Sequence, residues 1–165
     1  MSEEKKTEPV NNENTENKNP VMALQKIYLK DASFEAPNAP QIFQEQGQPQ
    51  IQMNLNQKVT TIAENTYDVV LTVTVTCTVN DKTAYLVEVQ QAGIFSLVNF
   101  PEQILHQTLG AYAPNVLFPF ARQAVADLVM NGGFQPLLLQ PVNFDQLYAE
   151  QVKRAQENSG NDTTQ

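Results

Sequence analysis

The sequence has no tryptophan, and its 165 residues include only one cysteine and one histidine. A single cysteine cannot form a disulfide within the chain. Cys77 lies in the apolar row of an expected strand, which favours a buried structural thiol over a reactive one. His106 and Cys77 alone do not supply enough ligands for a metal cluster of recognisable spacing. The sequence therefore predicts neither a metal site nor a cofactor.

Long apolar runs are also missing from the chain. No stretch approaches the roughly 20 apolar residues that a membrane-spanning helix needs. The segment from Met1 to Pro20 is polar and lacks the apolar centre of a secretory signal. We therefore expect the protein to stay in the cytoplasm.

Basic residues are scarce as well. Ten Lys and Arg residues face 18 Asp and Glu residues, which gives a net charge of −8. The acidic excess is not confined to the N-terminal tail, since 13 acidic residues still face seven basic ones from Val21 onward. Contacts with phosphate need clustered Lys and Arg, so the sequence argues against a nucleic-acid partner and favours a basic protein.

The chain is long enough for one hydrophobic core, and polar tails flank it. Residues 1–20 and 156–165 contain few apolar side chains, so we expect them to be disordered and the folded domain to span residues 21–155. Within the domain the apolar period changes once, near Phe100, from two to 3.6 residues. This predicts an α+β fold in which strands come first and helices follow.

Alternating apolar and polar residues predict an antiparallel sheet in the first half. The clearest strand is Thr66–Val79, in which apolar side chains alternate with threonines. Asn80-Asp81-Lys82 then predicts a tight turn into a strand at Thr83–Leu97. Two further strands are predicted, an irregular one at Met22–Phe34 and a cleanly alternating one at Gln50–Asn56.

The expected strand at Thr83–Leu97 has an unusual outer face. Its inner row contains Tyr85, Val87 and Val89, whereas the outer row contains Leu86, Glu88 and Gln90. An apolar side chain beside a carboxylate on a solvent-facing row is expected where a partner docks.

Two prolines three residues apart, Pro37 and Pro40, lie between the first two strands. They exclude a regular helix or a central strand, so we expect an extended crossover that passes over the sheet. Ile42 and Phe43 follow, and their large apolar side chains are expected to be shielded from water. They either fasten the loop to the core or line a groove, and the sequence leaves both possibilities open.

The second half predicts three helices. Pro101 opens a short helix from Glu102 to about Leu109, which Gly110 is expected to end. A longer helix from about Asn115 to Met130 has Pro119 near its start, with Phe118 and Phe120 partly off its apolar stripe. A third helix is capped by Asn143, carries Asp145 in its first turn and frays near Gln156.

Catalytic patterns are hard to find. No serine lies in a nucleophile-elbow context, and no glycine-rich loop opens a helix to hold phosphate. Glu35, Asp68 and Glu88 could in principle meet as acid and base, but each is expected on the sheet surface, where a carboxylate is usually solvated. We therefore do not expect an enzyme.

Four segments of the chain resemble the SecB family of export chaperones. They match the family in order and spacing, and the resemblance runs from about Leu24 to Glu150. The segments are FEAPNAP at Phe34–Pro40, EVQQAGIFSL at Glu88–Leu97, LGAYAPNVLFPFAR at Leu109–Arg122 and PVNFD at Pro141–Asp145.

This resemblance implies a four-stranded antiparallel sheet, a long helix and short flanking helices, assembled as a homotetramer that is a dimer of dimers. It implies an ATP-independent holdase that binds unfolded secretory precursors and delivers them to the SecA motor. It also implies that Asp31, Glu35, Leu86 and Glu88 bind the basic, zinc-bearing C-terminal segment of SecA, whereas SecB itself binds no zinc.

The resemblance further implies a client groove between the helix layer and the crossover. By position, its lining would include Phe34, Ile42, Phe43, Phe118 and Phe120. Val87 and Val89 match positions associated with subunit assembly in the family. They could equally be core residues of a strand.

Two alternatives remain open from the sequence. The chain could be a SecB-like chaperone dedicated to one client, such as an antitoxin, although the acidic docking residues argue against it. It could also be a small-ligand enzyme built on a helix-packed sheet, which the missing catalytic constellation disfavours.

Overall fold

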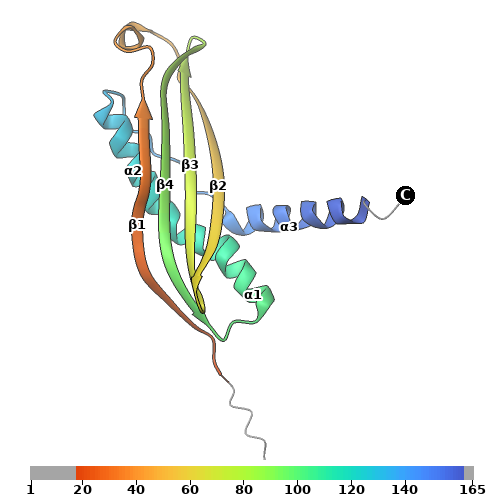
Figure 1. The fold of residues 1–165 in the computed structure, drawn as a ribbon. Helices are drawn as coiled ribbons and strands as arrows, with labels where there is room; N and C mark the ends of the chain where they lie inside the picture. Colours follow the sequence, from red (N-terminus) through yellow and green to blue (C-terminus); the bar gives the residue numbers. More distant parts are fainter. Residues whose placement is uncertain (1–17, 162–165) are drawn as a thin grey trace, which may run out of the picture.

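The computed structural model describes residues 18–161, which form one sheet with helices on one of its faces (Figure 1). Residues 1–17, which include most of the predicted N-terminal tail, and residues 162–165 lie outside the described residues. All four strands are antiparallel and lie side by side in the order β1-β4-β3-β2. The predicted α+β class is confirmed. The strands are β1 (Val21–Glu35), β2 (Gln50–Ala63), β3 (Thr66–Val79) and β4 (Lys82–Val98).

The β3–β4 hairpin follows the sequence pattern closely. Its turn is made by Asn80 and Asp81, whose φ angles of 50° and 62° match the tight turn that suits the twist of an antiparallel pair. The inner row of β4 is buried from Tyr85 to Leu97, whereas Leu86 and Glu88 on the outer row are only partly covered. The predicted division of this strand into two faces is confirmed.

The hydrophobic core lies between the inner face of the sheet and α2 (Ala113–Asn131). Figure 1 shows this helix crossing behind the sheet. The helix presents Leu117, Ala121, Val125 and Val129, which recur at helical spacing and are completely buried. They pack against the fully buried valines of β3 and β4, which are Val69, Val73, Val75, Val87 and Val89.

Gly110 does not end the first helix, contrary to the sequence prediction. The chain passes from α1 (Glu102–Gln107) through a wide helical turn at Thr108–Tyr112 and continues directly into α2. A Cβ atom on Gly110 would lie 2.5 Å from Cδ2 of Tyr148, so the glycine serves a close approach between helices and not a helix end.

Pro119 also differs from its predicted place near a helix start, because it lies inside α2. The proline cannot donate a hydrogen bond to the carbonyl of Asn115, one turn earlier. Both residues are exposed, so water can satisfy that carbonyl and the helix continues.

The last helix, α3 (Phe144–Asn161), begins as predicted but extends further. Oδ1 of Asn143 accepts a hydrogen bond from the Gln146 backbone N–H at 3.0 Å, which confirms the cap. The helix passes Gln156, where fraying was expected, and reaches Asn161, although Asn158 and Gly160 are weaker helix formers than the Gln, Lys and Arg residues before them. The first part of the predicted C-terminal tail is therefore helical, and it projects away from the sheet (Figure 1).

The crossover joins opposite edges of the sheet and passes over the β3–β4 turn (Figure 1). It is not wholly extended, since Gln41–Gln44 forms a single 3-10 turn after Pro40. That turn places Ile42 in the core and leaves Phe43 half exposed. One of these residues therefore fastens the loop, while the other remains accessible.

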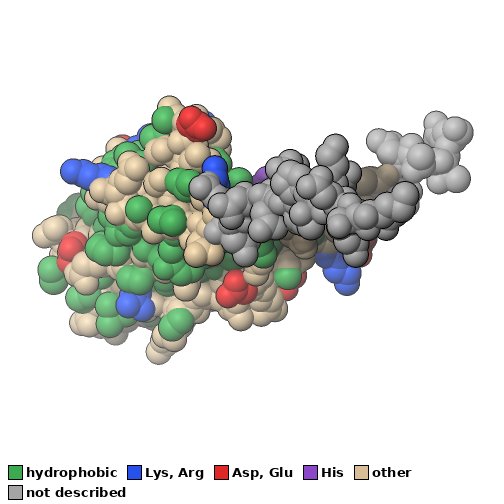
Figure 2. All heavy atoms as spheres, turned by 90° about the horizontal axis from the view of Figure 1, so that it is seen from below, with side chains coloured by type: hydrophobic (Ala, Val, Ile, Leu, Met, Phe, Trp, Pro, Cys, Tyr) green, Lys and Arg blue, Asp and Glu red, His purple; other side chains and the backbone are tan. Residues whose placement is uncertain are grey.

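The surface carries many apolar side chains and few charges on the face that Figure 2 shows. Exposed apolar residues are concentrated on the edge strands and on α2, and they include Val21, Met22, Leu24, Leu29, Ile62, Phe120 and Met130. None of the helices within residues 18–161 has the length and apolar character needed to cross a membrane.

Candidate functional site

The outer face of the sheet brings together all four predicted docking residues. Glu35 on β1 is paired with Leu86 on β4, and Asp31 is paired with Gln90. Residues that pair directly across an antiparallel ladder point to the same face, and Glu88 lies two residues from each of Leu86 and Gln90. Asp31, Glu35, Leu86 and Glu88 therefore share one surface, which we call the acidic face.

Hydrogen bonds to β3 support this surface. Thr74 donates from Oγ1 to Oε2 of Glu88 at 3.1 Å, which fixes the orientation of the carboxylate. Further along the same face, the Tyr28 hydroxyl donates to Oδ1 of Asp68 at 2.7 Å. That hydrogen bond raises the pKa of Tyr28 above its ordinary value. Asp31 and Glu35 remain exposed, so the face presents carboxyl groups beside an apolar side chain.

A groove of about 400 Å³ opens between the crossover and the segment that follows α2. Its walls include Ile42 and Phe43 from the crossover, Tyr85 from β4, and Phe134. The Phe134 ring centroid lies 4.9 Å from that of Tyr85 and 5.1 Å from that of Phe43. We call this the aromatic groove.

Phe34 reaches the same cluster from β1. Its ring stacks on Tyr85 with a centroid distance of 5.8 Å, and it lies 6.3 Å from the ring of Phe134. A Cβ atom on Gly132 would lie 2.1 Å from the tip of the Phe34 ring, so only glycine leaves room for this ring at the end of α2. The structure therefore brings Phe34, Ile42 and Phe43 to one aromatic cluster, and their role in binding a client stays a prediction.

Phe118 and Phe120 lie outside the lining of the aromatic groove, and their place in a client groove stays a prediction. Phe118 is buried at 5% exposure, because the ring of Phe144 at the start of α3 covers it at a centroid distance of 5.7 Å. Phe120 lies on α2 and is 49% exposed, away from the groove lining.

No periodic sequence pattern pointed to Phe134 and Leu137, which line the groove. Both lie just after α2, where Gly132-Gly133 marks a helix end. The available signal was an apolar run, Leu137-Leu138-Leu139, after Pro136 in a segment with no helical or strand period. Such a run has to bury part of its apolar surface, and here Leu137 lines the aromatic groove while Leu139 is buried in the core.

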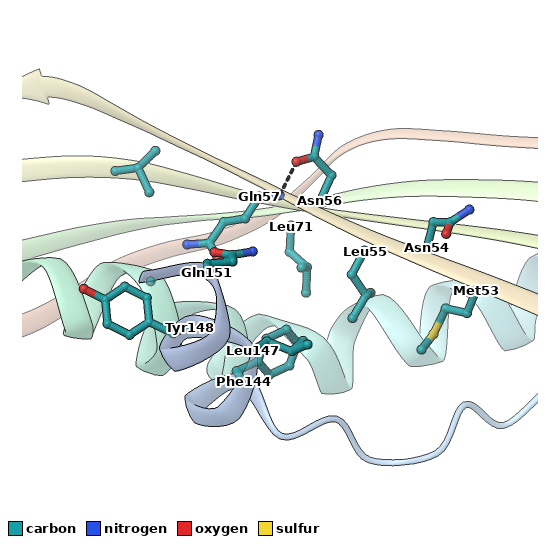
Figure 3. A pocket seen from close by; sticks show the side chains of 12 residues that line it. Met53, Asn54, Leu55, Asn56, Gln57, Leu71, Phe144, Leu147, Tyr148 and Gln151 are labelled. Carbon is teal, nitrogen blue, oxygen red and sulfur yellow. Dashed lines mark hydrogen bonds between the residues drawn. The ribbon is translucent and has the colours of Figure 1, made fainter. Parts of the chain in front are cut away.

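A second groove, of about 500 Å³, lies between β2 and α3 (Figure 3). Leu55 and Leu71 point from the sheet toward Phe144 and Leu147 of α3, and Tyr148 lies at one end. Leu147 is 37% exposed, which leaves an apolar strip open beside the edge of the sheet.

Val87 and Val89 lie in the core of the subunit. They are 1% and 0% exposed, and they face α2. Both valines are therefore packed as core residues of a strand, which is one of the two roles that the sequence left open. Neither side chain is accessible to a second copy of the chain.

Cys77 is buried at the base of the aromatic groove, beside Tyr85. Burial raises the pKa of the Cys77 thiol, and burial also raises the pKa of the Tyr85 hydroxyl. Both groups are therefore neutral near pH 7, which leaves the base of the groove without charge.

Comparisons with known proteins match this architecture. The family model described as "Preprotein translocase subunit SecB" matches residues 15–155. The chain belongs to the SecB family. It is 52% identical over 139 residues to the Protein-export protein SecB of Xylella fastidiosa strain Temecula1, a match that covers 84% of this chain and 81% of that protein. It is 53% identical over 139 residues to the protein of the same name from Hahella chejuensis, a match that covers 84% of this chain and 87% of that protein.

A solved structure with a similar fold is a SecB-like chaperone of Mycobacterium tuberculosis in complex with a ChAD peptide from the HigA1 antitoxin. The TM-score is 0.62 at 16% identity, and the match covers 73% of this chain and 90% of that one. At this identity the likeness shows the SecB-like fold alone.

Proposed function

We propose that the chain is an ATP-independent chaperone of the cytoplasm that holds unfolded secretory precursors and delivers them to SecA. The observation that carries the proposal is the identity of about half of the aligned residues with proteins named for protein export. The accessible aromatic groove supports client binding, because unfolded chains expose the apolar side chains that such a groove buries.

The energetics favour several grooves acting together. Ordering an extended client costs about 1 to 2 kcal/mol per residue, while each buried apolar side chain returns roughly 1.5 to 3 kcal/mol. One short groove therefore binds weakly. Linking several sites on one particle raises avidity by about 10² to 10⁴ without new contacts, which gives a reason for a homotetramer.

Assembly would use the exposed apolar side chains of the described residues. β1 is an edge strand, and it exposes Val21, Met22, Leu24 and Leu29. Val87 and Val89, predicted from the resemblance to affect assembly, would act by holding the sheet and α2 in place. Light scattering of the purified chain, with and without an unfolded precursor, tests this: we expect four chains, and one client bound to them.

The chaperone activity has a direct test. A chemically unfolded precursor is diluted with and without the chain at one tetramer per client, in the absence of ATP, and its light scattering is followed. We expect the chain to keep the precursor soluble. Aggregation at the same rate as without the chain would overturn the proposal.

The second candidate is a chaperone dedicated to one client. The mycobacterial protein, solved with an antitoxin peptide, is the observation that favours it. A dedicated chaperone would protect one client and fail with several unrelated precursors, so a panel of precursors in the assay above separates the two functions.

A further inference from the structure

The crossover forms one wall of the aromatic groove, and a carboxylate attaches that wall to the β3–β4 turn. Glu45 lies at the rim of the groove. Its Oε1 pairs with Nζ of Lys82, and its Oε2 accepts a hydrogen bond from Nδ2 of Asn80 at 3.0 Å. Nδ2 of Asn80 also donates to the backbone carbonyl of Gln46 at 3.2 Å. The wall is therefore tied to the turn by polar contacts.

The crossover backbone lies directly against the turn. A Cβ atom on Gly47 would lie 2.6 Å from Oδ1 of Asn80, so no larger residue fits there without a shift. At the other end of the crossover, Nδ2 of Asn38 donates to the carbonyl of Thr83 at 2.9 Å. Between these two attachments, the wall meets the opposite side of the groove through the Phe43 and Phe134 rings.

These attachments are accessible to water. The Lys82 side chain is 56% exposed, and exposed ion pairs exchange readily for water contacts. Hydrogen bonds from Lys82 and Asn80 lower the pKa of Glu45, so the carboxylate stays ionised and the pair stays formed near pH 7. A contact of this kind changes the equilibrium constant between an attached and a released crossover by only a few fold. The crossover can therefore open reversibly.

We propose that Glu45 is a positioning residue that sets the width of the aromatic groove, and so the size of the client side chain that the groove accepts. The inference rests on the proposed chaperone function. While Glu45 holds Lys82 and Asn80, the wall keeps Phe43 close to Phe134. A large aromatic side chain enters only when the wall is released. Its apparent affinity is therefore reduced in proportion to the fraction of molecules in which the wall is released. A small aliphatic side chain fits without release.

The test uses two uncharged peptides that are identical except that one carries phenylalanine where the other carries valine. Their affinities for the full chain and for Glu45→Gln are measured by fluorescence anisotropy. Glu45→Gln removes the charge and keeps an acceptor for Asn80. We expect the ratio of phenylalanine-peptide to valine-peptide affinity to rise about two- to fivefold. The matched control is Glu64→Gln, which removes the same charge from the exposed β2–β3 turn and should leave the ratio unchanged.

A second readout needs no peptide. The backbone amides of Ile42, Phe43 and Glu45 are hydrogen bonded within the crossover, and their hydrogen exchange should be faster in Glu45→Gln. A double variant that swaps the two charges, Glu45→Lys with Lys82→Glu, should restore part of the amide protection. It should also bring the ratio of the two peptide affinities back toward that of the unmodified chain.

Each result bears on the inference. Unchanged exchange, or equal changes in affinity for both peptides, would overturn the role of Glu45 while leaving the chaperone function standing. If the unmodified chain bound neither peptide and failed to protect a precursor, the proposed function itself would fall.

Discussion

Glu35 on β1 lies directly opposite Leu86 on β4, so a carboxylate and an apolar side chain face solvent together on the outer side of the sheet. Residues 51 positions apart in sequence are thereby combined into one surface. The surface suits a partner that offers a positive charge beside an apolar contact, as the basic segment of SecA would.

Glu88→Lys should abolish binding of the zinc-bearing C-terminal segment of SecA at moderate salt. The substitution reverses a charge that Thr74 orients, and like charges across an interface oppose association. Isothermal titration calorimetry with the isolated segment measures the loss. Glu64→Lys makes the same charge change on the β2–β3 turn, away from the acidic face, and should bind nearly as the unmodified chain does. Equal weakening by both variants would show that only net charge matters.

Phe134→Ala should weaken client binding, because it removes the ring that contacts Phe34, Phe43 and Tyr85. Deleting a buried aromatic ring costs about 3 to 5 kcal/mol, and Phe134 is only partly buried, so we expect a smaller loss of stability. Peptide affinity should fall roughly tenfold, as for a groove anchor worth about 1.4 kcal/mol. Phe120→Ala should change affinity little, and an equal loss there would show that Phe120 also contributes to client binding.

Gly110→Ala should destabilise the docking of α3, because the added Cβ would meet the Tyr148 ring. Overpacking of this kind costs about 1 to 3 kcal/mol, which urea denaturation can measure. Adding Tyr148→Ala should recover part of the loss, since it removes the clashing ring. If the double variant were as unstable as the sum of the single ones, the close contact would not be the cause.

Stability should fall as the pH rises above about 10, in part because of Tyr85. Burial raises the pKa of Tyr85 from its ordinary value of 10.0, so above pH 10 the unfolded chain loses this proton before the folded chain does. The contribution is complete below pH 10 and is lost progressively above it. Tyr85→Phe should flatten this decline in urea denaturation series. If the slope of unfolding free energy against pH is unchanged in Tyr85→Phe, groups other than Tyr85 cause the loss of stability at high pH.

The β3–β4 hairpin could be predicted from sequence because its signals are local. An alternating row over Thr66–Val79 and a turn at Asn80-Asp81 define both the strands and the register between them. Likewise, the sequence placed Leu86 and Glu88 on one face by period alone, and their juxtaposition with Asp31 and Glu35 came from the resemblance.

Sequence patterns are least informative where a distant residue decides the local structure. Gly110 reads as a helix end, but it lies inside the helical turn at Thr108–Tyr112, and the Tyr148 ring packs where a side chain would lie. Phe118 looks available on its own helix, yet Phe144 covers it. The aromatic groove combines β1, the crossover, β4 and the segment after α2, so no local pattern could reveal that Phe134 lies at its centre.

The strand order β1-β4-β3-β2 affects how the chain can fold during its synthesis on the ribosome. β2, β3 and β4 are joined by tight turns and can pair as they emerge. β1 is synthesised before all of them, yet among the strands of residues 18–161 it pairs with β4, the last one to be made. Contacts between distant segments form slowly, so β1, with its exposed apolar side chains, has to wait unpaired. A chain that we propose to shield unfinished proteins therefore passes through the same exposed condition during its own synthesis.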